Sequence, residues 1–287
     1  MTLAATADLV TAAIAQQRAV PAFNVVSIEH AEGIAEGAEH AGVAALMQVS
    51  ENTVNYHGGR IAPLVSACAQ IAAHASVPLA VHLDHFQDIA LIGDAIATAA
   101  DLGVTSIMVD AAHLSYDDNV DRTRAFVRSA HSAGLWVEAE LGEIGGKGNA
   151  HALGARTDPH EAAAFSADTG VDGLAVAVGS SHAMTTRDAR LDHDLITRLA
   201  ASLTIPLVLH GSSGLPDHEL RQAARSGIVK INIGTVLNVA YTAAVRQVLS
   251  ADSTATDPRK YQAAGRSAVA HTVAELCAVV AGECVSR

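Results

Sequence analysis

Short runs of apolar, largely β-branched residues recur along the chain, and each predicts a buried β-strand. Alanine-rich stretches with helical spacing lie between them, so the expected order is strand then helix throughout. Continuous apolar strands indicate a parallel sheet that is covered on its outside. The eight predicted strands are Val20–Asn24, Ala44–Val49, Val77–Leu83, Thr105–Val109, Leu135–Leu141, Asp172–Val178, Ile205–Leu209 and Ile228–Ile233. The helical stretches include Ile28–His40, Ile61–His74, Ile89–Ala100, Val120–Ala133 and His218–Ser226.

Eight strand–helix units close most naturally into a barrel. A doubly wound open sheet normally has fewer strands and a Gly-rich turn after the first, and no such turn follows Val20–Asn24. The length of 287 residues suits one barrel. We therefore predict an α/β protein with a single (β/α)8 TIM-barrel domain over residues 1–287. A first helix is expected within Met1–Gln17 and a C-terminal helix around Gln262–Ala281.

The net charge, the N-terminal segment and the cysteines indicate which partners, which cellular location and which thiol state to expect. The formal net charge is -12, which leaves no basic surface for nucleic acid or for anionic membranes, so neither is an expected partner. The N-terminal segment has no basic region and carries Asp8, which favours a cytoplasmic protein over a secreted one. Cys68, Cys277 and Cys284 are far apart and odd in number, so we expect buried thiols.

The predicted strands end in polar residues, where barrels of this kind carry their active sites. His85, His182 and His210 follow strands three, six and seven, and three imidazoles with an open position are a typical catalytic zinc set. A lone histidine at a strand end is more often a structural, hydrogen-bonded residue. Asp84 precedes His85 and either acts on a bound substrate or orients a neighbouring ligand.

Several motifs, in this order and spacing, resemble the class II, metal-dependent ketose-bisphosphate aldolases, which include fructose- and tagatose-bisphosphate aldolases. The likeness covers nearly the whole chain. The motifs are Val-Pro-Ala-Phe-Asn at 20–24, Val-His-Leu-Asp-His at 81–85, Ser-Ile-Met-Val-Asp at 106–110, Val-Glu-Ala-Glu-Leu-Gly at 137–142, Leu-His-Gly-Ser-Ser-Gly at 209–214 and Lys-Ile-Asn-Ile-Gly-Thr at 230–235.

The resemblance implies a role for each matching residue. Asp84 becomes the general acid/base, and His85, His182 and His210 become the metal ligands. Asp110 and Glu140 match carboxylates that bind a second or displaced metal, while Glu138 is expected to be a structural partner. The residues expected to bind substrate are Asn24, Ser50, Gly211, Ser212, Ser213, Asn232, Ile233, Gly234 and Thr235. The implied cofactors are one Zn²⁺, or another divalent metal in its place, per chain and a monovalent cation. The implied assembly is a homo-oligomer, either a dimer or a tetramer.

The reaction so implied is the reversible aldol cleavage of a phosphorylated ketose to dihydroxyacetone phosphate, or a related ketone, and an aldehyde. A divalent metal would act as the Lewis acid, so no Schiff-base lysine is needed. Consistent with this, no lysine ends a central strand: Lys230 opens the eighth strand and Lys147 lies in a Gly-rich loop. We expect both lysines to be solvated or to face phosphate.

The chain departs from the family pattern around the donor phosphate. After His182 the family carries a glycine, a tyrosine and a phosphate-binding lysine, whereas this chain has Ala-Met-Thr-Thr-Arg, so Thr186 replaces the lysine. Arg187 either substitutes for it or points to solvent. The loop at 145–149 lacks the family's acidic residue, and either Glu143 or His151 replaces it unless the loop only closes over substrate. Gly234 replaces a larger residue. These changes indicate a nonstandard ketose or phosphate position.

Two other functions are also compatible with the sequence. One is a different metal-dependent barrel enzyme, such as a sugar epimerase or a hydrolase, although the early His-x-His motif typical of such hydrolases is absent. The other is a non-catalytic barrel that acts as a partner of a sugar-phosphate enzyme. An intact set of three histidines with Asp84 argues against this second alternative.

Overall fold

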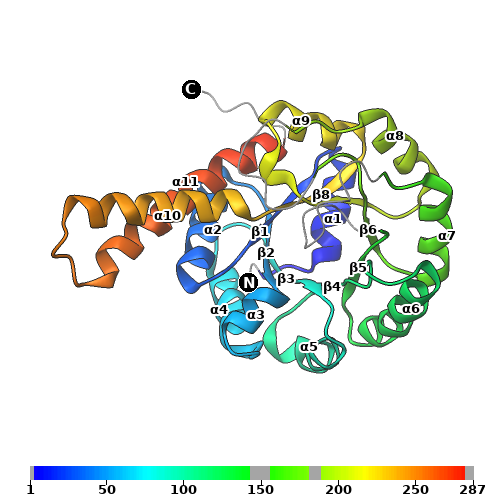
Figure 1. Ribbon diagram of the computed structural model, residues 1–287, viewed down its shortest axis with the longest axis horizontal. Helices are drawn as coiled ribbons and strands as arrows, with labels where there is room; N and C mark the ends of the chain where they lie inside the picture. The colour runs from blue at the N-terminus through cyan, green and yellow to red at the C-terminus, as the bar shows by residue number, and fades with distance from the viewer. Residues whose placement is uncertain (1–2, 143–155, 181–188, 282–287) are drawn as a thin grey trace.

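The computed structural model describes residues 3–142, 156–180 and 189–281, and it confirms the predicted barrel (Figure 1). Eight parallel strands follow one another around the barrel in chain order, and β8 pairs with β1 to close it. The strands are β1 (Val20–Asn24), β2 (Ala45–Ser50), β3 (Leu79–Phe86), β4 (Ser106–Val109), β5 (Trp136–Glu140), β6 (Gly173–Ala175), β7 (Leu207–Leu209) and β8 (Ile228–Ile233).

The predicted bounds of β3, β6 and β7 differ from those observed. β3 was expected to end at Leu83 but runs on to Phe86, because Ser50 of β2 pairs with Asp84 and Val109 of β4 pairs with Phe86. β6 and β7 are shorter than their apolar runs, since they pair with each other only at two positions, Leu174 with Leu207 and Ala175 with Val208. Pairing partners, rather than apolar character, decide where each strand ends.

Helices surround the barrel on its outside, and two of them form a hairpin that projects beyond it (Figure 1). That hairpin consists of α10 and α11, and α11 contains most of the C-terminal helix predicted around Gln262–Ala281. The helices are α1 (Thr6–Ala15), α2 (Ile28–Ala41), α3 (Glu51–Tyr56), α4 (Ala62–His74), α5 (Ile89–Leu102), α6 (Tyr116–Ser132), α7 (Pro159–Thr169), α8 (His193–Ser202), α9 (Asp217–Ser226), α10 (Thr235–Ala251) and α11 (Pro258–Val280), with a short 3-10 turn at Ser212–Gly214.

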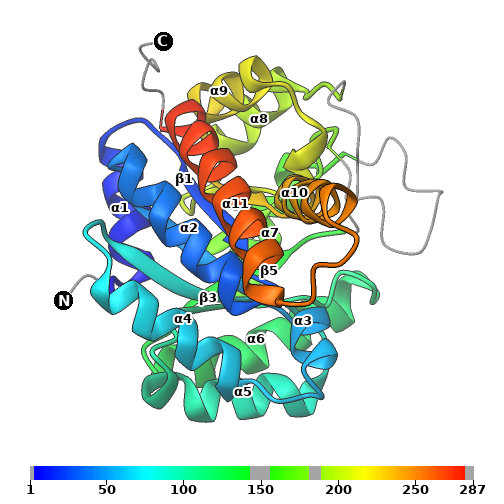
Figure 2. The same cartoon turned by 90° about the vertical axis from the view of Figure 1, so that its left-hand side faces the viewer.

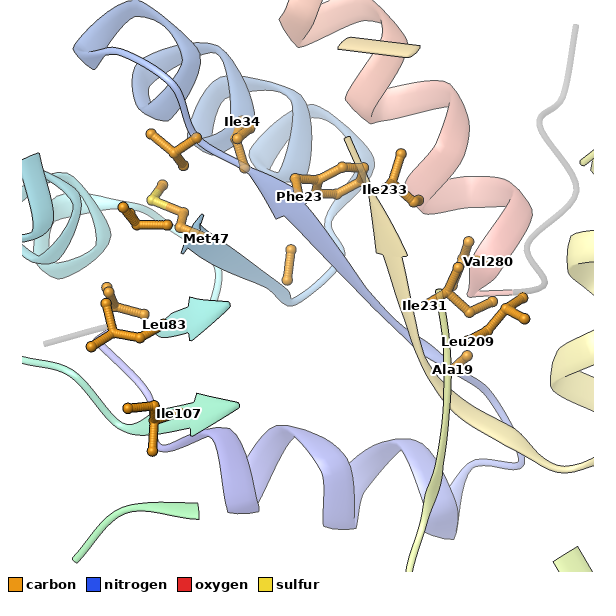
Figure 3. Packing of buried hydrophobic residues seen from close by; sticks show 14 of the residues in the cluster. Ala19, Phe23, Ile34, Met47, Leu83, Ile107, Leu209, Ile231, Ile233 and Val280 are labelled. Carbon is orange, nitrogen blue, oxygen red and sulfur yellow. The ribbon is translucent and has the colours of Figure 1, made fainter. Parts of the chain in front are cut away.

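Most strands contribute to two separate cores, because successive side chains point to opposite faces. Residues on the outer face, such as Phe23, Met47 and Ile233, pack beneath the surrounding helices (Figure 3). Residues on the inner face, such as Val20 and Leu46, form a smaller apolar cluster with α1. Helix α1 therefore closes the N-terminal end of the barrel from below.

Above the apolar cluster that packs against α1, the interior of the barrel is polar. Inward-facing positions on four strands carry polar side chains that are all buried, namely Gln48, His82, Glu138, Lys230 and Asn232. Apolar character thus belongs mainly to the outward positions and to the bottom layer of the interior. A line of buried polar groups leads up the barrel to the carboxyl ends of the strands.

Helices α2 and α11 lie side by side and pack closely through glycine (Figure 2). A Cβ added at Gly37 would meet the backbone oxygen of Ala270, and it would lie 2.7 Å from Cβ of Val273. A Cβ added at Gly93 on α5 would have no neighbouring atom within 4 Å. The close approach of α2 and α11 therefore depends on Gly37, whereas Gly93 faces open space.

The substitution Gly37→Ala should lower the free energy of unfolding by about 1–3 kcal/mol, because the added methyl group forces the two helices apart. Gly93→Ala is the matched control and should raise it by about 0.5–1 kcal/mol through helix propensity alone. Urea denaturation of the two variants measures both effects. Equal stabilisation in both would contradict the packing argument.

Cys68 and Cys277 are buried free thiols, as predicted, and burial raises the pKa of each to about 12. Cys284 lies outside the described residues. Within the described ranges, none of the helices combines the length and the apolar character that crossing a lipid bilayer requires.

Candidate active site

A bulge in β3 places Asp84 and His85 at the mouth of the barrel. Between Leu83 and Phe86 the register with β4 shifts, so β3 contains one residue more than its neighbour. His85 has φ of 54°, which is rare for a residue with a side chain. Bulges next to active sites re-aim side chains in this way. As a result the side chains of Asp84 and His85 both line the cavity at the mouth of the barrel, although strict alternation along a strand would turn one of them outward.

Three side chains at the carboxyl ends of different strands converge on one point. His85 comes from β3, Glu140 ends β5, and His210 directly follows β7. Each offers a ligand atom, and these atoms all lie within 4.8 Å of one another. The rings of His85 and His210 meet edge to face, with centroids 4.7 Å apart. Within the described residues this is the cluster that can hold a metal ion.

A carboxylate orients each histidine of this cluster. His85 places Nδ1 2.9 Å from Oδ2 of Asp110, and His210 places Nε2 2.8 Å from Oε1 of Glu138. An ionised carboxylate only accepts hydrogen bonds, so these two nitrogens donate. When the ring is neutral, as it is when a metal binds, its second nitrogen carries the lone pair that the metal needs, in the carboxylate–histidine–metal arrangement of many metal sites. Asp110 therefore acts on His85 and does not join the three converging ligands.

The spacing within the cluster suits a divalent ion. Nδ1 of His210 lies 3.2 Å from Oε2 of Glu140. Two ligands of a tetrahedral zinc lie roughly 3.4 Å apart at metal–ligand distances of about 2.0–2.2 Å. The predicted ligand His182 lies in 181–188, outside the described residues. The described groups thus offer two imidazoles and one carboxylate, which fit a metal centre.

Charge in this buried region is closely balanced. Burial alone would raise the pKa of Asp84, but its charge interactions with His85, His82, His210 and Lys230 outweigh burial and hold its pKa at about 2. Burial works to lower the pKa of His210, whereas its hydrogen bonds and charge interactions with Glu138 and Glu140 raise it to about 9. The pKa of Glu138 lies well below its usual range because of Lys230 and His210, despite its burial. Asp84 is therefore an ionised carboxylate at neutral pH.

Amide side chains hold this carboxylate in place. Nδ2 of Asn24 donates to Oδ2 of Asp84 at 2.9 Å, and Nδ2 of Asn232 approaches Oδ1 at 3.4 Å. Asn24 is itself fixed by Gln48, whose Nε2 donates to Oδ1 of Asn24 at 2.9 Å. Asp84 thus has a defined orientation while it keeps further acceptor capacity.

A cavity of about 250 Å³ opens at this end of the barrel beside Asp84 and His85. Ten of the residues predicted from the sequence line it, whereas Ile233, predicted with them, packs its side chain in the outer core instead (Figure 3). Sequence reasoning missed Gln48, although it lies two residues before Ser50 on the same inward face. The cavity is lined by Asn24, Gln48, Ser50, Glu51, Asn52, Asp84, His85, Gln87, Gly211, Ser212, Ser213, Asn232, Gly234 and Thr235.

One side of the cavity is built from backbone that suits an anion. Thr235 begins α10, and the N-terminus of a helix attracts negative charge. Oγ of Ser213 accepts a hydrogen bond from the backbone N–H of Val236 at 3.4 Å, which ties the 3-10 turn to this helix. Gly211 takes the left-handed conformation with φ of 66°, and this turns the chain sharply after His210. Two loops predicted to bind the ketose phosphate therefore lie together.

Gly234 allows Asn24 to approach closely. A Cβ at position 234 would lie 2.7 Å from Oδ1 of Asn24. That oxygen accepts a hydrogen bond from Gln48, while Nδ2 of Asn24 donates to Asp84. We expect Gly234→Ala to displace Asn24 and lower kcat/KM roughly 10- to 100-fold through misplacement of Asp84. Gly93→Ala should leave kcat/KM unchanged. Steady-state kinetics at equal thermal stability measure the effect, and wild-type kcat/KM in Gly234→Ala would contradict it.

The position of Lys230 differs from the prediction. It is fully buried inside the barrel, two residues after the start of β8, rather than solvated or facing phosphate. Nζ lies 2.8 Å from Oε2 of Glu138 and 2.6 Å from Oδ1 of Asn232. Period-two alternation with Asn232 was the signal that could have located it. Five residues predicted near the phosphate, or in and beside the loop at 145–149, lie outside the described residues: Glu143, Lys147, His151, Thr186 and Arg187.

Comparisons with known proteins agree with this geometry. The family model for class II fructose-bisphosphate aldolase matches residues 4–283. The chain is similar to the YdjI aldolase from Escherichia coli K12, with 29% identity and a TM-score of 0.84, over 99% of this chain and 100% of that one. It is also similar to a candidate fructose-1,6-bisphosphate aldolase from Coccidioides immitis, with 28% identity and a TM-score of 0.85, over 96% of this chain and 95% of that one. The fructose-bisphosphate aldolase from Campylobacter jejuni shares the fold, at 20% identity and a TM-score of 0.81 over 96% of this chain and 93% of that one.

Proposed function

Because the chain belongs to the class II fructose-bisphosphate aldolase family, we propose that it is a zinc-dependent aldolase that cleaves a phosphorylated ketose reversibly. The products would be dihydroxyacetone phosphate, or a related ketone, and an aldehyde. One observation carries the proposal: Asp84, held by Asn24, lies next to His85 in a cavity at the carboxyl end of the barrel, and His85 converges there with Glu140 and His210.

His85, His210 and Glu140 would hold the ion, and His182 is proposed as a further ligand. When bound, the ion would supply Lewis-acid chemistry that polarises the carbonyl group of the ketose. Asp110 and Glu138 would keep both imidazole rings in the correct tautomer. The monovalent cation implied by the family resemblance stays a prediction.

Asp84 would move the proton that bond cleavage requires. In the cleavage direction its carboxylate accepts the proton of the hydroxyl group at the bond being cut, and the aldehyde forms as that bond breaks. In the synthetic direction it returns the proton to the new hydroxyl oxygen. Asn24 and Asn232 would hold the carboxylate in line for both transfers.

The two sides of the cavity suggest how the ketose lies. The phosphate would bind at the Gly211–Ser213 turn and the start of α10, where backbone N–H groups and a helix N-terminus favour an anion. The hydroxylated part of the sugar would lie toward Gln48, Asn52 and Gln87, whose amides both donate and accept hydrogen bonds. Because Thr186 replaces the family lysine, we expect either a nonstandard ketose or a different position of the phosphate.

The test combines metal analysis with cleavage assays. The purified protein is analysed for bound metal and then incubated with fructose 1,6-bisphosphate, tagatose 1,6-bisphosphate and singly phosphorylated ketoses, before and after chelation. We expect chelator-sensitive cleavage that zinc restores. Bound metal without cleavage of any ketose would favour another reaction or a non-catalytic partner role, and full activity after complete metal removal would refute the metal mechanism.

Two further expectations remain proposals. A dimer or tetramer is expected from the family resemblance, and light scattering of the purified protein measures it. A cytoplasmic location is expected from the N-terminal segment, and fractionation of the source cells tests it.

A further inference from the structure

Lys230 is a buried charge that the proposed mechanism does not use. Its side chain is fully buried inside the barrel and is absent from the cavity lining. Completely buried lysines are rare, because an ammonium group taken from water must be paired to be tolerated. Nζ contacts Glu138 and Asn232, which belong to β5 and β8. The two contacts lead to different parts of the candidate active site.

The first contact leads to the metal cluster. Oε2 of Glu138 lies 2.8 Å from Nζ of Lys230, and Oε1 of the same carboxylate lies 2.8 Å from Nε2 of His210. Lys230 thus fixes the plane of a carboxylate that sets the tautomer and tilt of a candidate ligand. It also balances the negative charge that Glu138 would otherwise bring unpaired into the barrel.

The second contact leads to the proton-transfer group. Nζ of Lys230 donates to Oδ1 of Asn232 at 2.6 Å, so the amide of Asn232 must turn its Nδ2 the other way. Nδ2 faces Oδ1 of Asp84 at 3.4 Å. A reversed amide would bring an oxygen against the carboxylate. Lys230 therefore selects the amide orientation that suits Asp84.

We propose that Lys230 is a positioning residue that aligns both halves of the active site, holding His210 through Glu138 and Asp84 through Asn232. The proposal rests on the proposed function for the second half, whereas the first half concerns metal binding alone. Because both contacts come from one ammonium group, the metal ligands and the acid/base group keep a constant relative position. A lysine that served only as a counter-charge would stabilise the fold without affecting either half.

The test uses Lys230→Met, which keeps most of the side-chain volume but removes the charge and the hydrogen bonds. The zinc affinity of metal-free protein is measured by titration, and kcat is measured at saturating zinc. We expect zinc affinity to fall about 10- to 100-fold, as on loss of other groups that orient ligands. We also expect kcat at saturating zinc to fall at least roughly tenfold, because Asp84 is misplaced. A lower melting temperature with unchanged zinc affinity and kcat would overturn the proposal.

Single variants separate the two contacts. Glu138→Gln should weaken zinc binding more than it lowers kcat at saturating zinc, whereas Asn232→Leu should lower kcat more than it weakens zinc binding. If Lys230→Met does not fold because Glu138 is left unpaired, the double variant Lys230→Met/Glu138→Gln replaces it, since it buries no unpaired charge. It should bind zinc as Glu138→Gln does but have a lower kcat. Equal kcat in the double variant and in Glu138→Gln would overturn the Asn232 half.

Different results would contradict the aldolase proposal and the role of Lys230. Zinc titration needs no substrate, so a wild-type protein that cleaves no ketose would contradict the aldolase proposal while the effect of Lys230→Met on zinc affinity is still measured. Unchanged zinc affinity in Lys230→Met, with normal cleavage by the wild type, would contradict the role of Lys230 alone.

Discussion

The substitution Asp84→Asn should lower kcat for ketose cleavage by about 10²- to 10⁴-fold, the range that loss of a general acid/base group produces. The side chain keeps its shape but loses the negative charge that accepts the proton. Asp84 is not one of the three converging ligands, so bound zinc should stay near one ion per chain. Steady-state kinetics at saturating zinc, with metal analysis of the same sample, measure both quantities.

The nearby carboxylate Asp110 provides the control. Asp110→Asn weakens the hydrogen bond that orients His85, so it should reduce zinc affinity while excess zinc restores most of kcat. A loss of kcat in zinc-loaded Asp84→Asn, together with a loss of zinc affinity but not of zinc-loaded kcat in Asp110→Asn, would separate proton transfer from metal binding. If zinc-loaded Asp84→Asn keeps more than a tenth of the wild-type kcat, another group must move the proton.

The substitution His210→Ala should have the second large effect and abolish tight zinc binding. The imidazole contacts Glu140 on one side and Glu138 on the other, and its loss removes a ligand and leaves two carboxylates facing an empty space. Zinc affinity should fall by more than the about 10- to 100-fold expected for a residue that only orients a ligand. Loss of several kcal/mol of Lewis-acid stabilisation should reduce kcat/KM by about 10³-fold or more.

A histidine far from the cavity gives the matched control. His131 on α6 also pairs with a carboxylate, Asp172, at 2.8 Å, but its side chain is exposed. His131→Ala should leave zinc content and kcat/KM unchanged. His85→Ala, at a less buried position, repeats the test should His210→Ala unfold. Wild-type zinc content in both ligand variants would place the metal elsewhere.

The order of elements could be predicted because it depends on local pattern. β1 and β8 have the predicted bounds, and α2, α4, α5 and α9 lie within two residues of theirs. The short helix α3 was not predicted, since its six residues carry too little apolar periodicity and its start depends on Ser50, whose Oγ accepts from the N–H of Thr53. Local signals thus identify long elements well and short ones poorly.

The site could be predicted in part. Asp84, His85, Glu140 and His210 stand in motifs at strand ends, and parallel strands bring such ends to one rim. The bulge at His85 was not predicted, because it results from pairing with β4. The burial of Lys230 was not predicted either, because a lysine beside a buried strand looks solvated until its partner Glu138 is known to lie 92 residues away in the chain and 2.8 Å away in space.

By itself, therefore, the sequence determined the number and order of the strands, the family motifs and the residue types available at the barrel mouth. These follow from short-range periodicity and from chemistry carried by single residues. Only the tertiary structure decided which of those residues face inward, that Asp110 and Glu138 orient His85 and His210, and that one ammonium group inside the barrel contacts both halves of the site. The physical reason is that orientation, burial and pairing depend on neighbours from other strands, which come together only when the barrel closes.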